Sequence, residues 1–271
     1  MVKNLSKLSK LVKLAPLALI LVLSMSGCGL LPEQVDETAN WQAPRLYAEA
    51  RQELAAGGYE KAIQYYEKLE SRYPFGTYAQ QAQMEIAYAH YRQADQPQAL
   101  AAVERFIKLH PNHPNVDYMY YLRGLVNFND RVGPFNFIAP QDASERDPKA
   151  AREAFEAFKQ LVERFPNSVY AKDSLARMKY LVSALAMHDV HVARYYFRRG
   201  AYLAAVNRAQ GVVRDYTDAP AIEEALFIMA RCYDALGLGE LRDDTTRVLN
   251  TNYPDSRFVN AKGAAKSWWR F

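Results

Sequence analysis

The sequence predicts an all-α fold in which about five helical pairs stack as a repeat. Beyond residue 40, apolar residues follow the three- and four-residue spacing of amphipathic helices, and no β-type alternation is sustained. Turn residues and helix-stopping prolines also recur at matching offsets along the chain. Because 50% of the 271 residues are hydrophobic, the stacked pairs have enough apolar surface to form a sizeable core.

The repeat is marked by five landmark positions. They are Gly57, Ala94, Lys149, Gly200 and Gly237, which lie 37, 55, 51 and 37 residues apart. The shorter spacings are close to the period of about 34 residues that is typical of tetratricopeptide repeats. A helix stop lies 17 residues after each landmark, at Pro74, Pro111, Pro166, Thr217 and Pro254. The chain is therefore predicted to be a tetratricopeptide-like helical-repeat solenoid of about five helical pairs.

Each recurring position has a physical role. The landmark permits a tight turn between two antiparallel helices, and an alanine five residues later lets the helices approach closely. These alanines are Ala62, Ala99, Ala154 and Ala205. An aromatic residue or histidine before each stop is expected to close the last turn against the neighbouring pair: Tyr73, His110, Phe165, Tyr216 and Tyr253. Proline then ends the helix, because it lacks an N–H and clashes with the preceding turn.

The five pairs are placed at residues 44–74, 76–111, 114–166, 167–217 and 219–254. Residues 44–166 are predicted to form the N-terminal helical repeats, and residues 167–254 the C-terminal helical repeats. The second helices carry apolar stripes that one pair alone cannot bury but that stacked pairs can. The run 167–199 contains no glycine or proline, and its pattern is compatible with one long helix or with two.

Residues 1–27 have the layout of a secretory signal peptide. Four lysines and no acidic residue accompany a short apolar stretch, and small residues then lead into Cys28. The run LSMSGC at residues 23–28 resembles a bacterial lipobox, which implies that Cys28 is acylated and begins the mature chain. Gly29 is not the aspartate of inner-membrane lipoproteins, so the outer membrane is implied. The alternative for this stretch is a membrane helix with an incidental cysteine. If Cys28 is acylated, residues 28–43 are expected to form the lipidated N-terminus and a tether.

The net charge gives no support to nucleic-acid binding. Four of the 34 basic residues lie in the signal peptide, so the mature chain has 30 basic and 30 acidic residues.

The only cysteine after Cys28 is Cys232, and an acylated cysteine forms no disulfide. Cys232 shares a helical stripe with apolar residues, so we expect a small core hydrophobe rather than a reactive thiol.

The sequence offers little evidence of catalysis. It contains no nucleophile elbow, no phosphate-binding glycine loop and no cysteine–histidine signature. Carboxylates are expected to spread along solvated helix faces. His188 and His191 lie three residues apart, a spacing that can present two imidazoles to a metal, but no third ligand is evident. We therefore expect no enzyme activity, no metal and no cofactor other than the lipid on Cys28.

Tyrosine and arginine recur on the first helices of the N-terminal pairs. These residues are enriched at binding hot spots, although most of the tyrosines are expected to pack between helices. A second basic and aromatic cluster, residues 194–199 with Arg208, is interpreted equally well as a protein contact or a solvated face.

The insertion 130–147 is either functional or a self-packed loop. The tail 255–271, with Trp268 and Trp269, either contacts a partner or membrane or caps the last repeat.

An ordered set of short segments carries a more specific resemblance. They are RYPFG at 72–76, YAQQ at 78–81, RFIKL at 105–109, HPN at 113–115, DY at 117–118, RGL at 123–125, RDP at 146–148, FPNS at 165–168, RGA at 199–201 and VNR at 206–208. With the lipobox, this set resembles the BamD family, also called ComL or YfiO, of β-barrel assembly lipoproteins. The part of the insertion between Arg131 and Ala143 and the tail from about Ser256 lie outside the resemblance.

The resemblance implies an outer-membrane lipoprotein on the periplasmic side that helps insert β-barrel proteins. Its C-terminal pairs would dock on the POTRA domains of the barrel insertase and on accessory lipoproteins, with Arg208 and, more weakly, Arg199 at the contact. Its N-terminal pairs would bind unfolded outer-membrane proteins, for which the candidate residues are Phe75, Tyr78, Tyr118 and Tyr121. The alternative is a repeat lipoprotein that organises peptidoglycan or pilus assembly.

Overall fold

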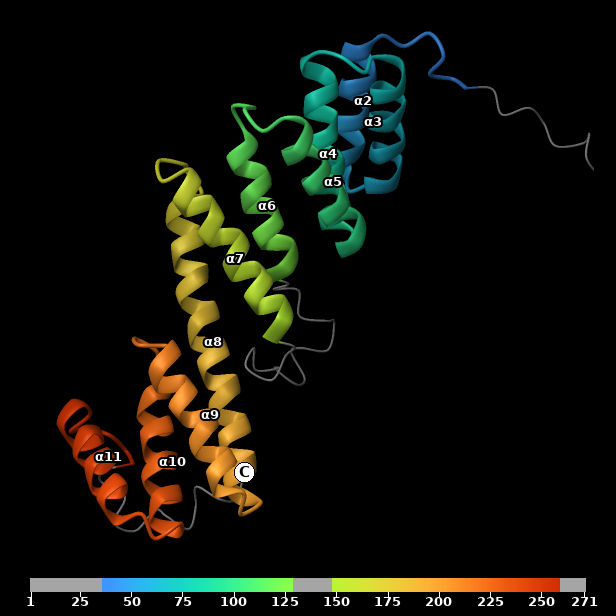
Figure 1. Cartoon of the computed structure of the whole chain (residues 1–271). Helices are drawn as coiled ribbons and strands as arrows, with labels where there is room; N and C mark the ends of the chain where they lie inside the picture. Colours follow the sequence, from blue (N-terminus) through green and yellow to red (C-terminus); the bar gives the residue numbers. More distant parts are fainter. Residues whose placement is uncertain (1–35, 129–147, 259–271) are drawn as a thin grey trace, which may run out of the picture. The chain divides into compact units, whose positions relative to one another are not determined.

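The computed structural model describes residues 36–128 and 148–258. Within these residues it contains ten α-helices and no β-strand (Figure 1). The helices are α2 (Ala43–Ala56), α3 (Tyr59–Arg72), α4 (Thr77–Arg92), α5 (Gln96–Leu109), α6 (Val116–Phe128), α7 (Pro148–Arg164), α8 (Ala171–Arg198), α9 (Tyr202–Asp215), α10 (Ala221–Ala235) and α11 (Gly239–Asn252). The chain divides into two units, residues 1–42 and 43–271, and these helices all belong to the second.

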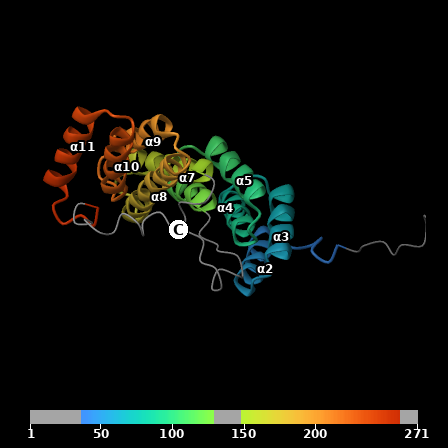
Figure 2. The same cartoon turned by 90° about the horizontal axis from the view of Figure 1, so that it is seen from below.

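The helices form five consecutive pairs. Helix α2 packs on α3, α4 on α5, α6 on α7, α8 on α9 and α10 on α11, and each pair also packs on the next one. First helices of neighbouring pairs touch as well: α2 with α4, α4 with α6, and α8 with α10. Two views show the helices following one another in chain order (Figures 1 and 2). The prediction of an all-α repeat of about five tetratricopeptide-like pairs is confirmed.

Four of the five landmarks lie in the left-handed region of backbone conformation. Their φ angles are 83° at Gly57, 62° at Ala94, 73° at Gly200 and 72° at Gly237. Each lies two residues before its second helix begins, and the residue after it donates its N–H to a carbonyl five residues earlier. This six-to-one hydrogen bond is that of a Schellman turn, which satisfies a free carbonyl at the end of the first helix. The landmark positions are therefore the turns within the pairs.

The fifth landmark, Lys149, was wrongly assigned as a turn. Helix α7 begins at Pro148 and runs for 17 residues, whereas the other second helices have 14 residues. Lys149 therefore lies in the first turn of a helix that starts one turn earlier than the repeat predicts. Proline is well suited to that first position, because its missing N–H would have no helical partner there. The 17-residue offset from Lys149 to Pro166 fits the repeat only because Ala154 and Phe165 keep the positions of the repeat's alanine and aromatic residue.

Four of the residues before the predicted stops end their helices in one conformation. Tyr73, His110, Tyr216 and Tyr253 share φ angles of −129° to −132° and ψ angles of 55° to 65°. Their N–H groups, and that of Phe165, donate to the carbonyl four residues earlier, which closes the last turn. The side chains of Phe165, Tyr216 and Tyr253 pack against the core, whereas that of Tyr73 is 37% exposed and covers its turn less than expected.

The run whose structure the sequence left open is one continuous helix. Helix α8 has 28 residues, which corresponds to about 42 Å at 1.5 Å per residue. In its first half, Leu181 packs with Ala154 and Phe158 of α7. In its second half, Val190 and Ala193 belong to a different cluster, formed with α9 and α10. Different partners along its length therefore stabilise one unbroken helix.

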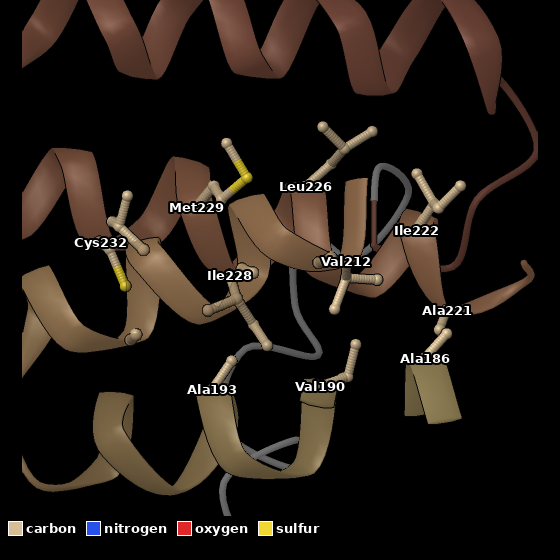
Figure 3. Close-up of a cluster of buried hydrophobic side chains, with 14 of the residues drawn as sticks. Ala186, Val190, Ala193, Val212, Ala221, Ile222, Leu226, Ile228, Met229 and Cys232 are labelled. Atoms are coloured by element: carbon tan, nitrogen blue, oxygen red, sulfur yellow. The ribbon is translucent and has the colours of Figure 1, made fainter. Parts of the chain in front are cut away.

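That second cluster is the core of the last two pairs. Val190 and Ala193 of α8, Val212 of α9 and Ile228 of α10 are fully buried in it (Figure 3). Cys232 is also fully buried there, and burial raises the pKa of its thiol to about 12. The prediction that Cys232 is a core hydrophobe is confirmed, because a thiol with this pKa stays protonated at neutral pH.

Candidate partner-binding surfaces

A pocket of about 520 Å³ lies where three helical pairs meet. Its walls are α4, the start of α6 with the turn before it, and the turn before α8. The two turns lie at the same end of their helices (Figure 1). The lining residues are Met84, Glu85, Tyr88, Pro114, Asn115, Asp117, Tyr118, Val169 and Tyr170. Since these residues come from distant parts of the sequence, the pocket forms only when the pairs stack.

Glu85 places a carboxylate among tyrosines. It is half-buried on α4, and burial raises its pKa above the ordinary value, although the charge of Arg51 on α2 opposes this shift. Burial also raises the pKa values of Tyr47, Tyr66 and Tyr118, and the negative charge of Glu85 raises them further. The carboxylate is thus in electrostatic contact with tyrosines from α2, α3 and α6.

The two carboxylates of the pocket differ in their hydrogen bonds. Asp117 accepts bonds from the N–H of Tyr118 at 2.9 Å and from the hydroxyl of Ser168 at 2.6 Å, which ties α6 to the turn before α8. In the described part of the chain, no group donates a hydrogen bond to Glu85, and the buried hydroxyl of Tyr66 has no partner either. Glu85 therefore keeps its capacity to bind a donor.

Two of the four candidate client-binding residues belong to this region. Tyr118 lines the pocket itself. Tyr121 supports it from behind: its ring stacks on Tyr170 at 4.7 Å and 15°, and its hydroxyl donates to Asp173 at 2.7 Å. Burial and the bond to Asp173 raise the pKa of Tyr121 to about 12. Tyr121 thus positions the aromatic wall of the pocket.

The other two candidates, Phe75 and Tyr78, lie at the turn between α3 and α4. Phe75 is 91% exposed, and Gly76 after it has a φ of 102°, a conformation that L side chains rarely adopt. The ring of Tyr78 lies 5.6 Å from that of Tyr47 on α2. Neither residue lines the pocket, so the structure separates the four candidates into a pocket group and a turn group.

The sequence interpretation missed Glu85. Carboxylates were expected on solvated helix faces, and Glu85 was not singled out. Its neighbours on one helix face, Ala82 three residues earlier and Ala89 four residues later, are fully buried. A carboxylate inside an alanine stripe was therefore the available signal, although only the tertiary structure places tyrosines around it.

On the C-terminal pairs, Arg208 is half-exposed and held by a carboxylate. Its Nη1 donates to Oδ1 of Asp189 on α8 at 3.1 Å, and 47% of its side chain remains accessible. Asp189 also accepts a hydrogen bond from the hydroxyl of Tyr216 at 3.4 Å. Arg208 is thus preorganised on the surface, with donors that remain available. Arg199 lies elsewhere, exposed at the end of α8 with its guanidinium 5.3 Å from the ring centre of Tyr195.

The basic and aromatic cluster around these arginines is not one surface. Arg194 points into the protein, where its Nε donates to Glu224 of α10 at 2.9 Å, and Phe197 packs against the core. Glu224 is only 3% exposed, so the expectation that carboxylates lie on solvated faces is wrong for this residue. The buried charge is tolerated because the guanidinium on α8 neutralises it.

A comparison with known protein families matches residues 39–249 to the YfiO family model, described as "Outer membrane lipoprotein". The match covers most of the chain, and the helical pairs described above span it. The chain belongs to the YfiO family of outer membrane lipoproteins.

Three relatives with similar sequences share the name outer membrane protein assembly factor BamD. The protein of Neisseria meningitidis serogroup A is 47% identical over 94% of this chain and 97% of its own length. Those of Vibrio cholerae and Haemophilus influenzae are 37% and 34% identical and cover 86% and 87% of this chain, or 96% and 89% of their own lengths. The resemblance to the BamD family is confirmed.

Several predictions concern residues outside those that the structure describes. They are Cys28 with the signal peptide, the insertion 130–147 and the tryptophans at 268 and 269. Of the helices in the described ranges, none is both long and apolar enough to cross a membrane. In the same ranges no three histidine, cysteine or acidic side chains group together as a metal site, and His188 and His191 belong to no such cluster.

Proposed function

We propose that this YfiO-family protein is a non-enzymatic, lipid-anchored scaffold of the machinery that assembles outer-membrane β-barrels. Its N-terminal pairs (44–166) hold unfolded outer-membrane proteins, and its C-terminal pairs (167–254) dock on a POTRA-bearing barrel insertase and on accessory lipoproteins. The observation that carries the proposal is the 47% identity, over nearly the full length of both chains, to a protein named for outer-membrane protein assembly. The peptidoglycan or pilus alternative is not favoured by these relatives.

The anchor is part of the same proposal. Acylation of Cys28 would hold the chain at the periplasmic face of the outer membrane, because each buried methylene contributes about 0.8 kcal/mol to membrane binding. No other cofactor is required for a scaffold. The repeat fold suits this role, because stacked helical pairs offer extended binding surfaces.

Arg208 is the proposed contact with the insertase. Its guanidinium is half-exposed and oriented by Asp189, so little side-chain entropy is lost when it pairs with a carboxylate of the partner. Arg199 is the weaker candidate for a contact with the insertase. Phe75 and Tyr78 at the turn after α3, together with Tyr118 and Tyr121 at the pocket, are the proposed client-binding residues.

The first test is an affinity pull-down of the intact lipoprotein from detergent-solubilised envelopes. We expect near-stoichiometric recovery of a POTRA-bearing barrel protein. Arg208→Glu should weaken that recovery by about 10- to 100-fold, because a charge is reversed at the interface. Arg214→Glu, an equal charge reversal at an exposed position of the same helix, is the matched control and should leave recovery unchanged. Recovery of only wall or pilus proteins would contradict the proposed function, and equal recovery with Arg208→Glu would contradict the site.

A further inference from the structure

The pocket between α4, α6 and α8 has an unbalanced negative charge. Its lining contains the carboxylates of Glu85 and Asp117 and no lysine, arginine or histidine. Asp117 is already engaged by two hydrogen bonds. Glu85 has neither a hydrogen bond nor an ion pair within the described residues, and Arg51, which acts on it electrostatically, does not line the pocket. A half-buried carboxylate of this kind has free capacity for a cation.

The aromatic side chains of the pocket favour the same type of ligand. Tyr88, Tyr118 and Tyr170 contribute rings to its walls, and tyrosine faces attract ammonium and guanidinium groups. Arg92, outside the lining, donates to the hydroxyl of Tyr88 at 2.7 Å and holds this ring in place. The three rings come from α4, α6 and the turn before α8, so they surround the ligand space from different sides.

The remaining lining residues fit an aliphatic chain. Met84 and Pro114 offer apolar surface, and Val169 at the turn before α8 is 84% exposed. Lysine and arginine carry a long apolar stem below the charged group, and this stem binds favourably to such surface while the charge finds its partner. An apolar residue beside the cation could then cover Val169.

We propose that this pocket binds the lysine or arginine side chain of an extended segment of an unfolded client protein. The cation pairs with the Glu85 carboxylate, its stem lies against the tyrosine rings and Met84, and a neighbouring apolar residue of the client packs on Val169. The inference deepens the proposed function, on which it rests, by assigning a charge preference to client binding. Acidic segments and free carboxyl termini should bind the pocket more weakly, because Glu85 and Asp117 repel them.

The experiment uses the mature, full-length lipoprotein in detergent and three labelled nine-residue peptides. The peptides share two phenylalanines and a serine and glycine background, and they differ only at the central residue: arginine, norleucine or glutamate. Binding is measured by fluorescence anisotropy at low salt and at physiological salt. The same measurements are made on Glu85→Gln and on Glu163→Gln, which removes an exposed carboxylate outside the pocket. Thermal unfolding checks that each variant is folded.

We expect the arginine peptide to bind about tenfold more tightly than the norleucine peptide, as is typical of a partly desolvated cation on aromatic rings. The glutamate peptide should bind most weakly. Glu85→Gln should bring the arginine-to-norleucine ratio close to one without changing the norleucine affinity, whereas Glu163→Gln should keep the ratio of the unmodified protein.

Three outcomes would overturn the inference. The first is equal affinity for the arginine and norleucine peptides, and the second is a preference for arginine that survives Glu85→Gln. The third is self-association of the protein that depends on Glu85, without peptide binding, since the occupant would then be a second copy. A urea-unfolded β-barrel protein, diluted into the same assay, separates the two proposals. If this protein binds but the peptides show no charge preference, the proposed function stands and the pocket inference fails. If it does not bind but the peptides show a preference that depends on Glu85, the pocket inference stands and the proposed function fails.

Discussion

Glu85 illustrates how a half-buried charge can oppose folding. Its carboxylate is half-buried among tyrosines, and burial raises its pKa. A group whose pKa is raised on folding binds protons more tightly in the folded state. The charged form therefore opposes folding at every pH above the folded pKa, and this penalty is relieved as the pH falls through that value.

The first prediction is that Glu85→Gln raises the thermal midpoint at pH 7. The neutral amide keeps the shape of the side chain and removes the desolvation penalty of the charge. The difference between variant and unmodified protein should shrink as the pH is lowered through the raised pKa of Glu85. Calorimetry from pH 7 to pH 4 measures it. A midpoint at pH 7 below that of the unmodified protein would show that the carboxylate stabilises the fold.

A second residue-scale prediction concerns the within-pair turns. Ala94 is left-handed with a φ of 62°, where a side chain costs about 1–2 kcal/mol. Ala94→Gly should therefore stabilise the protein by up to about 1 kcal/mol, after the larger unfolded-state entropy of glycine is subtracted. Gly57→Ala is the reverse change. A Cβ there meets nothing within 4 Å, so backbone conformation alone should destabilise by about 1 kcal/mol. Urea unfolding of both variants checks the opposite signs.

At the scale of elements, the close approach of α6 and α7 depends on a glycine. A Cβ at Gly124 would lie 2.3 Å from a ring carbon of Phe158, which is fully buried in the cluster that joins α6, α7 and α8. Helix propensity alone would favour alanine at this position by about 1 kcal/mol. The packing of the two helices therefore outweighs local preference.

We predict that Gly124→Ala destabilises the protein by about 1–2 kcal/mol, because overpacking of a tight core outweighs the gain in propensity. Gly211→Ala on α9 is the control. A Cβ there meets no atom within 4 Å, so this variant should be more stable by about 0.5–1 kcal/mol. Denaturant midpoints of the pair provide the measurement. Stabilisation by both substitutions would mean that the Phe158 ring moves aside at little cost.

At the scale of the whole molecule, α8 connects two cores. Its first half packs with α7, and its second half packs with α9 and α10. A helix that belongs to both clusters couples them, because unfolding of one exposes the helix on which the other depends. The helical pairs on either side of α8 are therefore expected to unfold together.

This coupling predicts the effect of Ser183→Pro, between Leu181 of the first cluster and Ala186 of the second. Proline inside a helix removes a hydrogen bond and costs about 3 kcal/mol or more. We expect a lower midpoint and two separate unfolding transitions instead of one in calorimetry. Ser183→Ala, which lacks the ring, should keep a single transition. A single transition in Ser183→Pro as well would show that α8 does not carry the coupling.

The helices, their order and four of the turns within the pairs can be read from the sequence alone. Local chemistry decides these features: the left-handed landmarks and the backbone at the stops are properties of a few neighbouring residues. Gly57 and Gly200, and the helix ends at Tyr73 and Tyr216, were located in this way. The one failure among the landmarks, Lys149, also has a local cause, because a proline starts α7 one turn earlier.

The surfaces that the helices present depend on contacts between segments far apart in the sequence. The continuity of α8 depends on the clusters that pack along it, and the burial of Glu224 depends on Arg194 from another helix. The pocket around Glu85 is lined from α4, α6 and two turns, and the half-burial that raises the pKa of Glu85 exists only when they meet. A carboxylate on a solvated helix face and one in an aromatic pocket are the same letter in a sequence. The distances to side chains remote along the chain distinguish them, because desolvation and charge act through space.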